Sequence, residues 1–79
     1  MIIVLNTNVL ISAIVFGGKP RKILESVLRG ELTLCLYEDI LGELEAVLQR
    51  PKFGFPSGVI RTILSELHTV GNSLHRPNE

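Results

Sequence analysis

The 79-residue chain contains a single cysteine, Cys35, and has no excess of either charge. One cysteine cannot form an intramolecular disulfide, and Cys35 lies in an apolar run, so we expect a small buried core residue in a protein of the reducing cytoplasm. Eight basic and eight acidic side chains cancel. No global field therefore favours nucleic acid, and a contact with phosphates would need a local basic cluster.

The chain also lacks an apolar run long enough to span a bilayer, so no membrane partner is expected. Its apolar start has no basic region before it and is interrupted by Asn6, Thr7 and Asn8, which excludes a secretory signal peptide. No internal repeat or interdomain linker is present. These features indicate one domain at most.

Apolar residues, by contrast, are abundant. They make up 46% of the chain and the mean hydropathy is positive, which excludes a disordered protein. A chain of this length buries a smaller share of its surface than a larger one. Apolar surface that the chain cannot cover itself must be covered by a partner.

Residues 2–5 are a continuous aliphatic run, typical of a strand buried on both faces in a parallel sheet. Thr7 or Asn8 is expected to cap a helix that follows at once and ends at Gly17 and Gly18. The sequence thus predicts a strand that passes directly into a helix.

A second helix is predicted from Pro20, which suits a first turn, to Gly30. Residues 32–36 then form a second predicted strand. Since helices fill the connection, we expect a right-handed crossover and a parallel strand pair.

The apolar stripe of residues 38–49 predicts a third helix, and a loop over 52–58 precedes a fourth helix over 59–67. From Gly71 onward we expect a polar, partly ordered tail. The predicted order is β-α-α-β-α-α. Because a two-stranded parallel sheet would have two unpaired edges, this fold is expected to be completed by oligomerisation.

Two stretches, VLNTNVLISA and LGELEAVLQRPKF, resemble the PIN-domain family, and within it the toxin components of bacterial and archaeal toxin–antitoxin systems. The resemblance spans essentially the whole chain, which we interpret as a partial PIN-like domain over residues 1–79. It implies an α/β fold with a parallel sheet flanked by helices. It also implies a ribonuclease in which several carboxylates bind Mg²⁺ or Mn²⁺.

The resemblance assigns the catalytic and metal positions to Asn6 and Glu43. The family has an aspartate at the first of these positions. Asn6 keeps an oxygen but loses the charge, so metal affinity and turnover are expected to fall, and the substitution is either natural or deliberate. The spacing of residues alone does not distinguish Glu43 from Glu45. The family's remaining acids are expected beyond the end of this chain.

Thr7, Asn8 and Ser12 correspond to the surroundings of this site, where they would support it. The alternative is structural: helix capping by Thr7 or Asn8, and a bond from Ser12 to the carbonyl four residues earlier.

Basic residues occur in two groups that could contact RNA phosphates, the alternative being a solvated surface. They are Lys19, Arg21, Lys22, Arg50 and Lys52. His68 and His75 have no neighbouring cysteine or acid pair, so a zinc site is not expected.

The leading hypothesis is therefore a truncated PIN-domain protein, related to ribonuclease toxins and inactive or weakly active alone. The alternative is a non-catalytic interaction module that binds another copy, a complementary chain or an antitoxin. A nucleotide-binding loop is not favoured, because such a loop needs glycines between the first strand and the first helix. Residues 6–8 contain no glycine, and Gly17 follows the first predicted helix.

Overall fold

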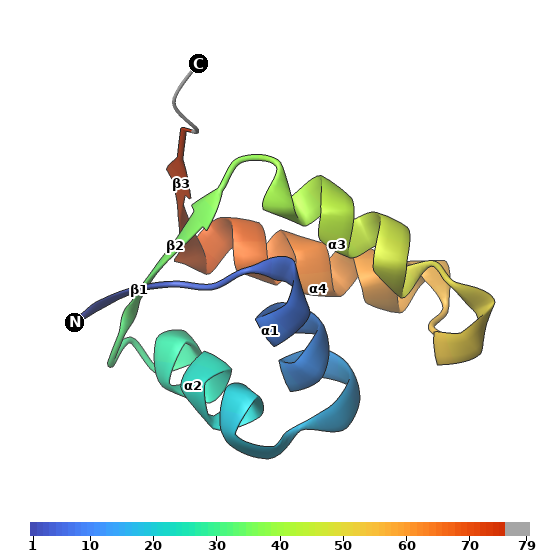
Figure 1. Cartoon of the computed structure of the whole chain (residues 1–79), viewed down its shortest axis with the longest axis horizontal. Coiled ribbons are helices and arrows are strands. Elements are labelled where there is room, and N and C mark those ends of the chain that lie inside the picture. Colours follow the sequence, from blue (N-terminus) through green and yellow to red (C-terminus); the bar gives the residue numbers. More distant parts are fainter. Residues whose placement is uncertain (76–79) are drawn as a thin grey trace.

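The computed structural model describes residues 1–75, in which three parallel strands form one sheet in the order β1-β2-β3 (Figure 1). β1 is Ile2–Val4, β2 is Thr33–Tyr37 and β3 is Gly71–Leu74. The strands lie together at one side of the molecule and the helices at the other. The predicted α/β class, a parallel sheet flanked by helices, is confirmed.

Helical segments make up both crossovers. The first predicted helix is divided, because the Gly17 N–H donates to the Ser12 carbonyl (2.9 Å) and so closes a wider, π-helical turn. Within residues 1–75, none of the helices has the length and apolar character needed to cross a bilayer. The segments are α1 (Thr7–Ile11), the π-helix η1 (Ser12–Phe16), α2 (Gly18–Leu28), α3 (Ile40–Leu48), the 3₁₀ turn η2 (Pro51–Phe53) and α4 (Ser57–Val70).

The end of η1 is capped by a side chain from α2. Arg21 donates from Nε to the Ala13 carbonyl (2.8 Å) and from a terminal nitrogen to the Ile14 carbonyl (2.9 Å). These are carbonyls that the end of a helix leaves without partners. Gly17, at φ 82°, supplies the left-handed backbone that turns the chain toward α2.

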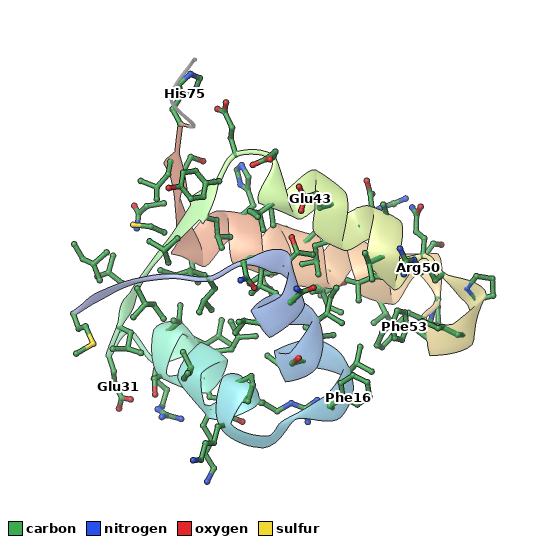
Figure 2. All side chains as sticks on the ribbon, in the orientation of Figure 1. Phe16, Glu31, Glu43, Arg50, Phe53 and His75 are labelled. Atoms are coloured by element: carbon green, nitrogen blue, oxygen red, sulfur yellow. The ribbon has the colours of Figure 1, made fainter. Side chains whose placement is uncertain are left out.

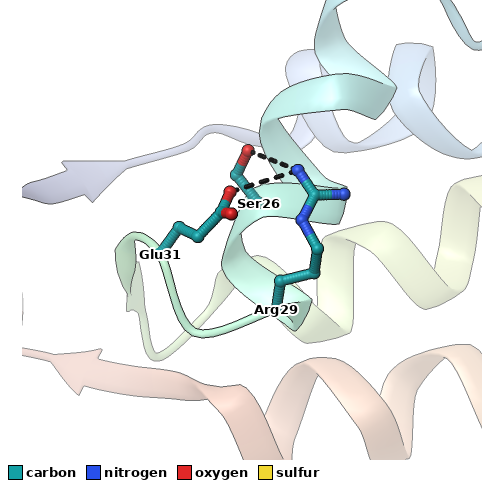
Figure 3. Close-up of polar contacts among 3 residues, drawn as sticks. All are labelled: Ser26, Arg29 and Glu31. Atoms are coloured by element: carbon teal, nitrogen blue, oxygen red, sulfur yellow. Dashed lines mark hydrogen bonds and ion pairs between the residues drawn. The ribbon is translucent and has the colours of Figure 1, made fainter.

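The end of α2 is a Schellman turn. Gly30 has φ 81° and donates to the Val27 carbonyl, while the Glu31 N–H donates to the Ser26 carbonyl. Arg29 bridges the Glu31 carboxylate (3.1 Å) and the Ser26 hydroxyl (3.3 Å) (Figure 3). The hydrogen bond from Arg29 lowers the pKa of the Glu31 carboxyl. Because both side chains are well exposed, water screens this pair and it adds little stability.

The hydrophobic core lies between β2 and the helices. Its fully buried side chains come from α1, β2 and α3: Leu10, Leu34, Leu44 and Leu48. Both crossovers move across the sheet in the same direction, from β1 to β2 and from β2 to β3. Right-handed connections of this kind place all helices on one face. The molecule is accordingly thin, with principal extents of 33 × 32 × 19 Å.

The strand β1 differs from its prediction. Ile2 is 70% exposed and Val4 is 52% exposed, so the expectation of a strand buried on both faces is wrong. The physical reason is that β1 is an edge strand of a sheet whose helices cover one face only. Its aliphatic residues comprise one half-buried position, Ile3, which packs against the core, and two positions that face solvent.

The strand β3 was not predicted at all. We expected a two-stranded sheet and a polar tail from Gly71, but Gly71–Leu74 pairs in parallel with residues 34–37 of β2. Main-chain hydrogen bonds to β2 form this strand without an apolar pattern in its own side chains. The predicted tail beyond residue 75 lies outside the described residues.

Gly71 gives a direct test of this packing. A Cβ at position 71 would lie 2.7 Å from the Leu67 carbonyl oxygen, whereas a Cβ at Gly42 in α3 meets nothing within 4 Å. We expect Gly71→Ala to lower the free energy of unfolding by about 1–3 kcal/mol, because backbone must move. Gly42→Ala should raise it by up to about 1 kcal/mol. Urea unfolding followed by circular dichroism measures both, and a neutral Gly71→Ala would contradict the position of β3.

Candidate functional site

The first element of the site is Asn6, between β1 and α1. Its backbone is extended (φ −94°, ψ 173°) and its Oδ1 accepts a hydrogen bond from the Val9 N–H at 3.0 Å. Asn6 is thus the N-cap of α1, and the prediction that Thr7 or Asn8 caps this helix is wrong. All three residue types suit a cap. Asn6 takes the role because the helical backbone begins immediately after it.

The second element is a contact between α1 and α3. The Thr7 hydroxyl donates to Glu43 Oε2 at 2.8 Å, joining residues 36 positions apart. Figure 2 shows Glu43 on α3, above the start of α1. The structure therefore brings Asn6, Thr7 and Glu43 into one corner at the carboxyl end of β1. We call these three residues the polar corner.

The other two predicted supporting residues are Asn8, on α1, and Ser12, the first residue of η1. Asn8 is exposed and Ser12 is half-buried. Neither side chain makes a hydrogen bond in the part of the chain that the structure describes, so the bond from Ser12 to the preceding turn, the structural alternative for this residue, is not present.

The structure also separates the two glutamates that the spacing left open. Glu43 faces α1, whereas Glu45 lines a small pocket between α3 and α4 together with Gln49 and Arg61. The contact with Thr7 therefore selects Glu43 for the polar corner, in agreement with the resemblance. Which of the two glutamates has a role in catalysis stays a prediction.

The donor set of the polar corner is small for a metal site. It contains one carboxylate, one oxygen of which accepts from Thr7, and one amide oxygen that already caps α1. Among residues 1–75, no group of three or more acidic, histidine or cysteine side chains is placed to hold a metal ion. These residues alone do not fit the set of several acids that the resemblance implies, so we derive no step through a metal.

The predicted RNA-contacting residues lie at three places. Arg21 is engaged with the carbonyls of η1, and the Lys52 ammonium lies over the Phe53 ring, 5.1 Å from its centroid. Lys19 and Lys22 are exposed on the first turns of α2. Arg50 is exposed after α3 (Figure 2). Two of the five cations thus have an intramolecular role, which does not exclude a contact with phosphate.

A polar feature that the sequence did not indicate lies at the carboxyl ends of β2 and β3. His75 Nδ1 lies 2.9 Å from Glu38 Oε1, and a pocket of about 180 Å³ beside it is lined by Glu38, His68, Asn72 and others. Figure 2 shows His75 at the tip of β3, away from Glu43. The pairing of β3 with β2 creates this contact, and β3 has no strand pattern of its own.

A sequence model of the PIN domain matches residues 2–79. The chain belongs to the PIN-domain family. This family is nuclease-like and generally metal-dependent. No curated protein and no solved structure matches the chain. The polar corner of this PIN domain lies where ligands bind in open α/β sheets, outside the carboxyl end of a strand.

The cap can be tested apart from any activity. We expect Asn6→Ala to lower the free energy of unfolding by about 1 kcal/mol, because the Val9 N–H loses its acceptor. Asn6→Asp keeps an acceptor and should leave stability nearly unchanged. Asn8→Ala, two residues further on and inside α1, is the matched control and should leave stability unchanged or raise it slightly. Urea unfolding of the four proteins measures these differences, and an equal effect at positions 6 and 8 would contradict the assigned cap.

Proposed function

We propose that this PIN domain is related to the ribonuclease toxins of toxin–antitoxin systems and that alone it is inactive or weakly active. The observation that carries the proposal is the polar corner, in which Asn6 and Glu43 lie beside the end of β1 and are linked through Thr7. This arrangement supports the residue assignments that the resemblance implies. The proposal names RNA as the class of substrate and an antitoxin as the class of partner, without identifying either molecule.

The proposed weak activity follows from the small number of negative charges in the polar corner. Phosphodiester cleavage by a metal-bound water needs a divalent cation, and hard cations are held by negatively charged oxygens. At position 6 an amide replaces the carboxylate of the family, and Glu43 is the one carboxylate of the corner. Each missing negative charge weakens the attraction for Mg²⁺ or Mn²⁺ and for the charge that develops on the phosphate.

An RNA cleavage assay with Mn²⁺ tests this proposal. We expect no metal-dependent cleavage by the unmodified chain above a protein-free control. Asn6→Asp restores the charge and should tighten Mn²⁺ binding by about tenfold or more, measured by isothermal titration.

Two further variants supply the matched control. In the Asn6→Asp background, Glu43→Gln should abolish the gain in Mn²⁺ affinity, whereas Glu45→Gln should retain it. Efficient cleavage by the unmodified chain would overturn the proposed inactivity. An unchanged Mn²⁺ affinity in Asn6→Asp would overturn the assignment of the corner.

A second candidate function is non-catalytic binding of another polypeptide, either a copy of the chain, a complementary chain or an antitoxin. The exposure of two aliphatic residues on the same face of β1, Ile2 at 70% and Val4 at 52%, supports it. Within residues 1–75, β1 is also an edge strand, and both an unpaired backbone edge and exposed aliphatic side chains favour association with another polypeptide. A domain without catalysis can still use this surface.

Self-association is the form of this function that the purified chain can show alone. We expect the mass from light scattering to rise from 8.7 kDa toward twice that value as the concentration increases through the micromolar range. A folded chain that stays at its monomer mass up to millimolar concentration would count against binding of a copy.

A further inference from the structure

The connection between α3 and α4 places two aromatic rings in contact. The ring centroids of Phe53 and Phe55 are 6.4 Å apart, and the ring planes are inclined at 31°. Phe55 packs against the hydrophobic core. Phe53 is half-buried and, within residues 1–75, is not among the side chains that pack there. Its ring is therefore a partly exposed aromatic surface, supported by a neighbour that is anchored in the core.

The backbone around Phe53 is well defined by hydrogen bonds. The Phe53 N–H donates to the Arg50 carbonyl and the Gly54 N–H donates to the Pro51 carbonyl, both at 3.1 Å. Gly54, at φ 66°, turns the chain, and Pro56 immediately precedes α4. Two hydrogen bonds and two prolines thus hold the ring in place before any ligand arrives, which lowers the entropic cost of binding.

The same end of the molecule carries positive charge. Residues 46–65 contain Arg50, Lys52 and Arg61 and no acidic residue, in a chain whose net charge is zero. All three side chains are exposed, and within residues 1–75 none of them forms an ion pair. Glu45 lines a pocket with Arg61, so Arg50 and Lys52 are the cations whose charge is least offset. They form a local basic cluster of the kind that phosphate contacts require in a neutral protein.

The position of Lys52 joins the two features. Its ammonium lies over the Phe53 ring, 5.1 Å from the centroid. An exposed cation–π contact is weaker than the stacking of a nucleobase on an aromatic ring. A base can therefore displace the ammonium from the ring, and the displaced cation is then available for the phosphate next to that base.

We propose that Arg50, Lys52 and Phe53, which we call the aromatic platform, bind an unpaired segment of single-stranded RNA. One base stacks on Phe53, and the two cations contact the adjoining phosphates. The choice of RNA as the ligand rests on the proposed function. Figure 2 shows Glu43 on α3, with Arg50 and Phe53 beyond the end of that helix. Seven residues separate Glu43 from Arg50, roughly 10 Å along a helix axis, so a strand bound to both sites would span about two helical turns.

Fluorescence polarisation with a labelled, unstructured oligoribonucleotide of about ten nucleotides tests the stacking contact, with EDTA present to separate binding from metal chemistry. Phe53→Leu should weaken binding at least about fivefold, whereas Phe53→Tyr, which keeps an aromatic ring, should retain the affinity of the unmodified chain. Circular dichroism checks that both variants fold. RNA duplex of the same sequence should bind more weakly, since its bases are already stacked.

Three outcomes of this experiment would overturn the inference: equal losses in the two Phe53 variants, a duplex that binds as tightly as the single strand, or no binding by the unmodified chain. None of them affects the Mn²⁺ affinity of Asn6→Asp, which tests the proposed function separately. RNA should bind at least as tightly as the DNA strand of the same sequence. Tighter binding of DNA would overturn the assignment of RNA as the ligand.

The salt dependence of the affinity tests the phosphate contacts. Arg50→Gln should reduce the slope of log affinity against log salt concentration by about 0.7, the value for one phosphate contact on a single strand. Arg29→Gln removes the same charge at the end of α2, away from the platform, and should leave the slope unchanged. Equal changes in the two variants would mean that overall charge, rather than the aromatic platform, controls binding.

Discussion

The right-handedness of the two crossover connections determines on which face of the sheet the helices and the core lie. Because the chain moves from β1 to β2 to β3 in one direction, right-handed connections place every helix on the same face of the sheet. The core then forms on that face, around Leu34 and Leu36 of β2. The other face keeps aliphatic side chains in contact with solvent. Within residues 1–75, the helix layer on one face and the exposed side chains on the other are thus consequences of a single constraint.

The polar corner shows that the requirements of the fold and of the chemistry differ at one position. The start of α1 needs an oxygen acceptor at residue 6, and the Asn6 amide supplies it to the Val9 N–H. Binding of a divalent cation needs negative charge in addition. An asparagine therefore supplies the acceptor that the start of α1 needs without supplying the negative charge that the proposed chemistry would need. Stability and metal affinity become separable at this residue.

Much of the fold was predictable from local patterns, since aliphatic runs and helical spacing depend on near neighbours. Such patterns predicted a strand over residues 2–5, a helix from Pro20 and a helix over 38–49, and the structure has β1 at Ile2–Val4, α2 at Gly18–Leu28 and α3 at Ile40–Leu48. The strand β3 was not predictable in this way, because Gly-Asn-Ser-Leu has no strand pattern and forms by pairing with β2. Asn6, Thr7 and Asn8 are all suitable N-cap residues, so the sequence did not determine which of them caps α1. The position at which the helical backbone begins selects Asn6.

For the candidate site, too, some features were predictable from the sequence and others depended on tertiary packing. The sequence by itself determined the α/β class, the polar residues after the first strand and the absence of a carboxylate at position 6, since these properties depend on residue identity and order. Only the tertiary structure decided that Glu43 rather than Glu45 meets Thr7, that Glu38 meets His75, and that, within residues 1–75, one face of β1 is exposed. Each of these depends on how distant segments pack. Packing is set by the relative position of whole elements, to which a local pattern contributes no information.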